Sequence, residues 1–341
     1  MSVSVIGVDL GGTKIAVAGM RGAELGDSLL RSTNLTGSGP LLDQVVEMVG
    51  QVRGPVLDGV GIGVPSVVEF ATGRVVSSVN VPLDEVPLRQ VLGERLGVPV
   101  FVDNDATVAA LAEAHDEHLR MVARDLVMIT IGTGVGGGFV LGGRIYRGAT
   151  GGAGEIGHTL VALDVRRGVP AADGFPQPGS LEYAAAGHAL DRLGEQAALD
   201  APDSALGRIH AAGRPVLGPD IVRAALDGDE AARAIVDVWG QRIGIGVANA
   251  INTFDPKEVV IGGGGAQAGN LLLEPARRVA AQYTLPGLGR RTTVRLARHG
   301  VRAGVLGAAL LAEEELEAAA AGPPRSSREA TARDPEASEV S

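Results

Sequence analysis

The segment VIGVDLGGTKIAVA, residues 5–18, contains the pattern that decides the fold. A short apolar run rich in β-branched residues ends at Asp9, a glycine-rich turn follows, and a second apolar run begins at Lys14. Two such runs joined by a short turn predict a β-hairpin. The glycines let the backbone N–H groups of the turn surround a bulky anion. An ordinary tight hairpin with Asp as turn former would also explain this turn.

A second copy of the pattern, VMITIGTGVGGGFVLGGRI, occupies residues 127–145. We again expect a strand, a glycine-rich turn over Gly132–Gly138 and a returning strand. This turn lacks the lysine of a Walker A loop and does not open a helix, as a dinucleotide-binding fingerprint would. The repeat predicts two related lobes with a cleft between them. Two anion-binding turns, one on each lobe, can hold one polyphosphate between them.

The composition agrees with a two-lobed globular protein and excludes several other classes. The 341 residues exceed the ~100–200 typical of one domain. The chain is 45% hydrophobic and 21% charged, and its 51 glycines follow no Gly-X-Y period, which excludes collagen. A net charge of −10 without a long basic run argues against a nucleic-acid partner. The absence of cysteine excludes disulfides and thiolate catalysis.

Nothing in the sequence indicates a membrane partner. Residues 1–12 lack a basic region followed by a long apolar core, so they do not resemble a signal peptide. No apolar stretch reaches the ~18 residues that a membrane-spanning helix needs. We therefore expect a cytoplasmic protein.

Strands alternate with helices along the rest of the chain, which predicts α/β architecture. We predict a small N-terminal lobe over residues 1–120, a large lobe over 121–302, and a last helix over about 303–317 that packs back on the small lobe. Residues 322–341, rich in Pro, Ser and charge, predict a disordered tail. The other expected helices cover residues 41–53, 88–96, 105–115, 181–199, 219–226, 231–253 and 271–281. The other expected strands cover 56–64, 98–102 and 258–261, with a strand and loop over 73–81.

Several polar residues near these turns are suited to phosphate chemistry. Asp9, at the end of a strand, could hold a hydrated Mg²⁺ beside phosphates. Lys14 is one of only two lysines in the chain. A third glycine cluster, Gly262–Gly265, follows a strand and could receive the base and ribose of a nucleotide, or could simply be a strand-to-helix turn.

Other residues are suited to binding and activating a hydroxyl group. Asp105 follows the strand over 98–102 and could accept the proton of a hydroxyl that attacks phosphorus, although Asp is also a favoured helix N-cap. Glu155 and His158 lie three residues apart, and Glu182 follows a Pro/Gly loop. These side chains could hydrogen-bond to vicinal hydroxyls or simply be surface groups. A zinc site at His158 is not expected, because the chain has no cysteine and no second histidine lies nearby.

Taken in order, the motifs resemble the ROK family (repressors, open reading frames and sugar kinases) of the actin-like ATPase superfamily, over roughly residues 3–312. The resemblance is carried by Asp9–Lys14, Asn104-Asp105, Ile131–Gly138, Gly154–His158, Phe254-Asp255-Pro256 with Val259–Gly265, and Ala303–Ala309. It implies an α/β, two-lobed actin-like (ribonuclease-H-like) fold with ATP and sugar in the cleft between the lobes. It also implies ATP-dependent phosphorylation of a sugar hydroxyl, commonly the 6-hydroxyl of glucose, and a homodimer.

The resemblance assigns roles by position. Asp105 matches the catalytic base, and Asp9 matches a residue that binds Mg²⁺ with ATP through water. The sugar ligands implied are Asn80, Asn104, Glu155, His158 and Glu182. The ATP-binding residues implied are Gly11, Gly12, Thr13, Lys14, Gly132, Thr133, Gly134, Gly263 and Gly264.

Three departures from the family pattern all lie on the sugar side. The cysteines of the family's zinc site are absent, with Ser180 in the place of one of them. Ser66 stands where glycine is usual, and Thr107 where asparagine is common. Phosphoryl transfer is therefore better supported than glucose as the acceptor. N-acetylmannosamine, fructose, allose or a C7-cyclitol stay open as acceptors, and polyphosphate stays open as donor.

A catalytically silent, sugar-binding regulatory protein is the alternative from another class. The repressors of the family carry a winged helix-turn-helix before the first strand, whereas here the first strand is expected to begin at Val3. We therefore expect no DNA-binding domain.

Overall fold

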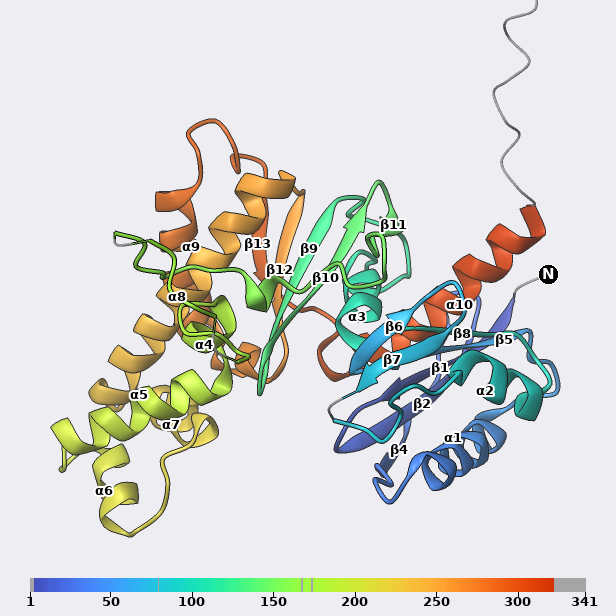
Figure 1. The fold of residues 1–341 in the computed structure, drawn as a ribbon, viewed down its shortest axis with the longest axis horizontal. Helices are drawn as coiled ribbons and strands as arrows, with labels where there is room; N and C mark the ends of the chain where they lie inside the picture. The colour runs from blue at the N-terminus through green and yellow to red at the C-terminus, as the bar shows by residue number, and fades with distance from the viewer. Residues whose placement is uncertain (1–2, 79, 167, 173, 322–341) are drawn as a thin grey trace, which may run out of the picture.

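The computed structural model describes residues 3–78, 80–166, 168–172 and 174–321 (Figure 1). The tail predicted over 322–341 lies outside these residues. Two sheets stand side by side, each with its own helices, and form a small and a large lobe (Figure 1).

The small-lobe sheet is built around the predicted hairpin. Strands β1 (Ser4–Leu10) and β2 (Lys14–Arg21) pair antiparallel, with Leu10 opposite Ile15. Strands β5 (Gly59–Val64) and β8 (Val100–Asn104) extend the sheet in parallel, and β3 (Glu24–Leu25) and β4 (Leu29–Ser32) pair with β2. Helices α1 (Ser38–Val52) and α2 (Leu88–Leu96) share one apolar core with these strands.

The large-lobe sheet repeats the same plan. Its strands are β9 (Leu126–Ile131), β10 (Val135–Leu141), β11 (Arg144–Ile145), β12 (Glu258–Gly262) and β13 (Thr293–Leu296). The order β11-β10-β9-β12-β13 matches β3-β2-β1-β5-β8, with the same antiparallel hairpin and the same two parallel neighbours. The duplication predicted from two short motifs therefore extends over both sheets.

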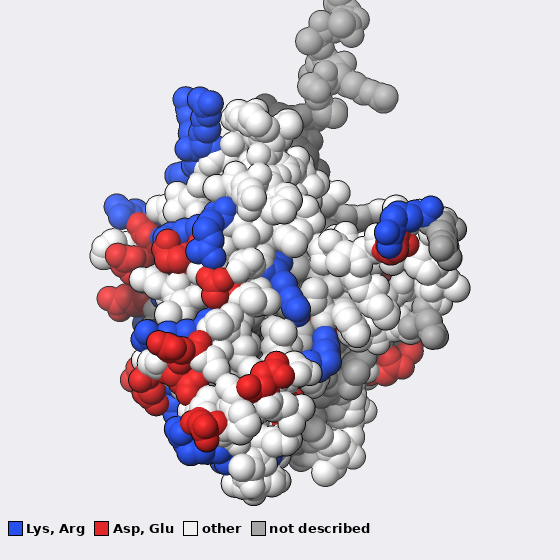
Figure 2. All heavy atoms as spheres, turned by 90° about the vertical axis from the view of Figure 1, so that its left-hand side faces the viewer, with Lys and Arg blue, Asp and Glu red and all other residues white. Residues whose placement is uncertain are grey.

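The helices of the large lobe enclose its core. They are α4 (Leu181–Ala185), α5 (Gly187–Asp200), α6 (Ala205–Ala211), α7 (Gly218–Leu226), α8 (Glu230–Phe254) and α9 (Asn270–Tyr283). The long helix predicted over 231–253 is confirmed, and its apolar stripe is buried. Its internal glycines allow close packing, because Gly240 lies against Pro275 and Gly244 against Ala276 of α9. On the face of the large lobe that lies on the left in Figure 1, acidic and basic side chains are interspersed (Figure 2).

Two helices lie where the lobes meet. Helix α10 (Ala303–Ala321) packs on β1 and β5, where Gly7 and Gly61 leave room for its backbone. Helix α3 (Asp105–Glu113) packs on α10 and on β10. Residues of both helices share one apolar core with strands of both sheets, so the two helices join the lobes.

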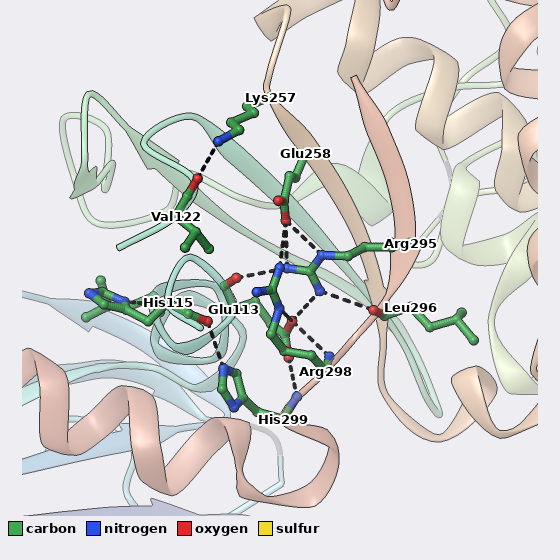
Figure 3. Close-up of polar contacts among 10 residues, drawn as sticks. Glu113, His115, Val122, Lys257, Glu258, Arg295, Leu296, Arg298 and His299 are labelled. Carbon is green, nitrogen blue, oxygen red and sulfur yellow. Dashed lines mark hydrogen bonds and ion pairs between the residues drawn. The ribbon is translucent and has the colours of Figure 1, made fainter. Parts of the chain in front are cut away.

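A buried ion cluster ties together the two places where the chain crosses between the lobes (Figure 3). Glu113, at the end of α3, is fully buried and accepts hydrogen bonds from Arg295 Nη1 (2.6 Å) and from the N–H groups of Arg298 (3.0 Å) and His299 (2.9 Å). Arg295 Nε also donates to Glu258 Oε2 at 2.7 Å. The chain that leaves the large sheet toward α10 is therefore anchored on α3.

Several predicted boundaries were wrong for identifiable reasons. Gly136–Gly138 belong to strand β10 rather than to the turn, because they pair with Met128–Thr130 of β9. Gly137 and Gly138 carry no side chain because the backbones of Gly154 and Ala106 lie against them. The helix predicted over 181–199 is two helices that meet at Ala186. Strand β8 runs to Asn104 instead of ending at 102. The hairpin of β6 (Ser66–Glu69) with β7 (Arg74–Ser78), helix α6 and strand β13 were only partly predicted or missed.

Candidate active site

The first turn joins β1 to β2 in few residues. The N–H of Gly11 donates to the Lys14 carbonyl at 3.1 Å, and Thr33 Oγ1 donates to the Gly11 carbonyl at 2.6 Å. Thr13 and Lys14 are exposed. A Cβ on Gly12 would lie 3.1 Å from the carbonyl oxygen of Asn80, so this predicted sugar ligand lies directly beside the turn.

Asp9 precedes that turn, and its carboxylate lies against Gly304 in the first turn of α10. Burial, and then the negative charge of Asp105, raise the pKa of Asp9 to about 6, while Lys14 opposes the rise. A cation at this position would favour the charged carboxylate and so oppose the shift. The residues present therefore fit a divalent ion held beside phosphates.

Asp105 is the first residue of α3, and the N-cap of the helix is Asn104 rather than Asp105. The Oδ1 of Asn104 accepts hydrogen bonds from the N–H groups of Ala106 (2.9 Å) and Thr107 (3.2 Å). Its amide nitrogen lies 3.4 Å from the Ser66 carbonyl, which it faces as a donor. This capping leaves the Asp105 carboxylate available, with one hydrogen bond from the Ala106 N–H at 2.8 Å. Burial raises the pKa of Asp105, and the charge of Glu155 adds to the rise.

The other predicted hydroxyl ligands come from the large lobe. Glu155 precedes the short 3₁₀ helix Ile156–His158, of which His158 is the last residue, and 3.6 Å separate Glu155 Oε2 from His158 Nε2. Both side chains are open to solvent. The ring of Phe175 meets the His158 ring edge-on, with 5.4 Å between their centroids.

The loop after His158 is closed by hydrogen bonds. The N–H groups of Val161 and Ala162 both donate to the Gly179 carbonyl, and Ser180 caps α4 through the Tyr183 N–H at 3.1 Å. Ser180 therefore has a structural role at the position where the family pattern has a cysteine. Within the described ranges, no three His, Asp or Glu side chains group as a metal site would require.

Glu182 lies at the second turn. Its Oε2 accepts a hydrogen bond from the Val135 N–H at 2.8 Å, and a Cβ on Gly134 would lie 2.5 Å from that oxygen. The next residue back, Leu181, donates its N–H to the Thr159 carbonyl at 2.9 Å. Glu182 thus lies between the segment of His158 and the second glycine-rich turn.

The second and third glycine clusters meet at one cavity of about 600 Å³. Gly132, Thr133, Gly264 and Gly265 line it together with Trp239. Gly263 lies behind the wall with a left-handed φ of 77°, against the backbone of Ile131. Ligand pockets typically enclose about 300–1,000 Å³, so the cavity can accept a nucleoside. Trp239 is 2% exposed and belongs to the core, and nothing in the sequence indicated its part in the cavity wall.

Two further residues near the site carried no recognisable signal in the sequence. Asp103 is 3% exposed and forms an ion pair with Arg147, with 2.7 Å from Nε to Oδ2. Arg147 is distant from Asp103 in the chain, and only the fold brings them together.

Comparison with known proteins agrees with this arrangement. The model of the ROK family matches residues 5–315. The chain belongs to the ROK family. A glucokinase of Halalkalibacterium halodurans is 33% identical over 318 residues, which cover 91% of this chain and 95% of that protein. A xylose repressor of Caldicellulosiruptor bescii is 30% identical, over 89% of this chain and 76% of that protein.

A solved structure extends the similarity to three dimensions. A ROK family glucokinase from Streptomyces griseus, in complex with glucose and AMPPNP, superposes with a TM-score of 0.75 at 30% identity, covering 91% of this chain and 99% of that one. The fold is the two-lobed actin-like ATPase fold that the sequence predicted. Among the described residues, no helix has the length and hydropathy to cross a membrane.

Proposed function

We propose that the protein is a sugar kinase that transfers the γ-phosphoryl group of ATP to a hexose hydroxyl, with the 6-hydroxyl of glucose as the favoured acceptor. One observation carries the proposal. The nucleoside-sized cavity reaches Gly132 and Thr133 of the second turn, while the first turn follows Asp9, a carboxylate close enough to Asp105 for its pKa to be raised by that charge. Membership of the ROK family and the similarity to glucokinases support it.

In this proposal the two turns hold the phosphates. The N–H groups of Gly11 and Gly132 close the turns themselves, so the phosphates would meet the backbone N–H groups of Gly12, Thr13, Thr133 and Gly134. Thr13 and Thr133 add exposed hydroxyls. Gly263 and Gly264 form the adenosine side. Asp9 would hold Mg²⁺ through water, and the ion would supply neutralising charge to the phosphate oxygens.

Asp105 is proposed to accept the proton of the sugar hydroxyl as its oxygen attacks the γ-phosphorus. Its raised pKa makes it a stronger base than an ordinary aspartate. Asn104 supports this role because it caps α3, which leaves the Asp105 carboxylate available for the substrate. Glu155 and His158 are proposed to bind the sugar hydroxyls, with Asn80 and Glu182 at the two turns.

Nucleoside triphosphate is favoured over polyphosphate as donor because the cavity is partly apolar and includes the face of α8 with Trp239. Polyphosphate has no apolar part that could pack against this cavity wall.

The regulatory alternative has a relative in the xylose repressor, but Asp105 and both turns are present here as the kinase reaction requires. The cytoplasmic location and the homodimer stay predictions.

A coupled assay of ADP release tests the proposal. Purified protein with Mg-ATP is screened with glucose, mannose, fructose, allose, N-acetylated hexosamines and cyclitols. We expect sugar-dependent ADP release, fastest with glucose. Faster turnover of another polyol would replace glucose as the acceptor. Nucleotide binding without turnover of any of them would favour the regulatory protein.

A further inference from the structure

Arg147 is a side chain of the large lobe that binds three elements of the small lobe. It follows β11, and its Nε donates to Asp103 Oδ2 at 2.7 Å, at the end of β8. Its Nη2 lies 3.4 Å from Glu315 Oε1 on α10. Its guanidinium carbon lies 3.4 Å from the centroid of the Phe70 ring, at the tip of the β6–β7 hairpin.

On the small-lobe side, the partner of Arg147 belongs to the corner that carries the proposed base. Asp103 is 3% exposed, and its Oδ1 accepts the Asn104 N–H at 2.9 Å. Burial raises the pKa of Asp103, and Arg147 is the main group that opposes the rise. Asn104 then caps α3, whose first residue is Asp105. The guanidinium is thus connected to the base through two consecutive residues.

On the large-lobe side, Arg147 begins the loop that carries the proposed sugar ligands. Its carbonyl accepts the Ala153 N–H at 3.0 Å, which closes the turn immediately before Glu155. Within this turn Gly151, with a φ of 90°, lies against the Val68 carbonyl of β6. The loop therefore rests on the small lobe at Arg147 and at Gly151.

We propose that Arg147 is a positioning residue that sets the place of Asp105 relative to the Glu155–His158 segment. This inference rests on the proposed function and adds to it. A base must lie within hydrogen-bond reach of the hydroxyl it deprotonates, and the hydroxyl is placed by ligands from the other lobe. A displacement of 1 Å costs on the order of 10²-fold in rate. One ion pair that spans the lobes can enforce that alignment without touching the substrate.

A purely structural role makes a different prediction. Removing Arg147 alone leaves the buried charge of Asp103 without its partner and lowers stability, whereas removing both charges together often restores it. If the pair only stabilises the fold, a double Leu variant with normal stability will also have normal kinetics. If the pair aligns the site, stability returns and the rate does not.

The experiment compares Arg147→Met, Arg147→Lys and the double variant Arg147→Leu/Asp103→Leu, with Arg278→Met as control. Arg278 forms an exposed ion pair with Asp237 on the large lobe. We expect Arg147→Met and the double variant to lose on the order of 10- to 100-fold in kcat and to raise the sugar KM. Nucleotide affinity, read from the fluorescence of the single tryptophan, should stay within about 2-fold, since the cavity is untouched. Arg147→Lys should recover part of the rate.

Normal kcat and sugar KM in Arg147→Met, or in a double variant of restored stability, would overturn the inference. Hydrogen exchange is measured on the same proteins so that the result does not depend on finding the right sugar. Amides of residues 148–158 should exchange faster in Arg147→Met than in the control, and unchanged exchange there contradicts the inference. Failure of wild-type turnover on every sugar would count against the proposed function instead.

Discussion

Asp9 and Asp105 lie on either side of Gly63 at the carboxyl end of the small-lobe sheet. Asp9 is the register partner of Gly63, and a Cβ on Gly63 would lie 3.5 Å from the Cα of Asp105. Burial raises the pKa of both carboxyl groups, and the charge of Asp105 raises that of Asp9 further. In the free protein the charge of Asp105 therefore disfavours the ionisation of Asp9, and a bound cation would oppose that effect.

The stability of the free protein should depend on Asp9 and on pH. Its folded-state pKa of about 6 exceeds the ordinary 3.8, so folding favours the protonated form. This contribution is fully present below pH ~4 and is lost as pH rises through about 6. Asp9→Asn should therefore be more stable than wild type at pH 8, by about 1–3 kcal/mol in urea unfolding, and equal to it near pH 4.

The control is Asp27→Asn, which changes an exposed carboxylate of the same lobe. It should show no such pH-dependent gain. An Asp9→Asn variant that is less stable than wild type at pH 8 would show that the ionised Asp9 carboxylate does not destabilise the folded protein.

Glu155→Ala should raise the KM for the sugar by about 10- to 100-fold, because a hydrogen bond between a carboxylate and a hydroxyl is removed. The KM for ATP should change little, since the nucleotide cavity is formed by other segments. Initial-rate kinetics with each substrate varied in turn measure both. Glu274→Ala, an exposed carboxylate on α9, is the control. If only the KM for ATP moves, Glu155 belongs to the phosphate side.

Gly134→Ala should weaken nucleotide binding. The new Cβ would lie 2.5 Å from Glu182 Oε2, so either that carboxylate or the turn must shift. We expect the Kd for ATP, followed by the fluorescence of Trp239, to rise by about 10-fold or more, as the loss of one charge-assisted hydrogen bond would give. Gly50→Ala is the matched control, because nothing lies within 4 Å of the added methyl group. Equal affinities in the two variants would contradict this prediction.

Glu113→Ala should destabilise the protein by about 1–3 kcal/mol for each group left without its acceptor, because the N–H groups of Arg298 and His299 lose theirs and Arg295 keeps only Glu258 of its two carboxylate partners. Glu47→Ala removes one member of the exposed Arg31–Glu47 pair and should cost at most about 1 kcal/mol. Urea unfolding monitored by circular dichroism compares the two. Similar losses in both variants would contradict the anchoring role given to the cluster in Figure 3.

Local patterns predicted most of the fold, and long-range contacts account for what they missed. The hairpins and helix α8 depend on residues close together in the chain, and both were predicted within a few positions. The break before α5 depends on the Gly187 N–H, which donates to the Gly132 carbonyl at 2.8 Å instead of continuing the helix. Gly132 and Gly187 lie too far apart in the chain for a local sequence pattern to predict this hydrogen bond.

The same limit applies to the site. The glycine-rich turns and the strand-end carboxylates are local motifs, so they could be identified and matched to a family. The sequence offered Asp105 as the N-cap of α3, but Asn104 is the N-cap. The strand β8 runs two residues beyond its apolar run and ends at Asn104, so the helix begins at Asp105. The Arg147–Asp103 pair needs both lobes in place before either residue has a partner.

Turnover by Asp105→Asn tests the central claim most directly. The substitution removes the proton acceptor and leaves both turns and the nucleotide cavity intact. With saturating Mg-ATP and the best sugar, we predict that kcat falls by about 10²–10⁴-fold while the affinity for ATP stays near that of wild type. A variant with near-normal kcat would contradict the account, because the hydroxyl would then be deprotonated by some other group.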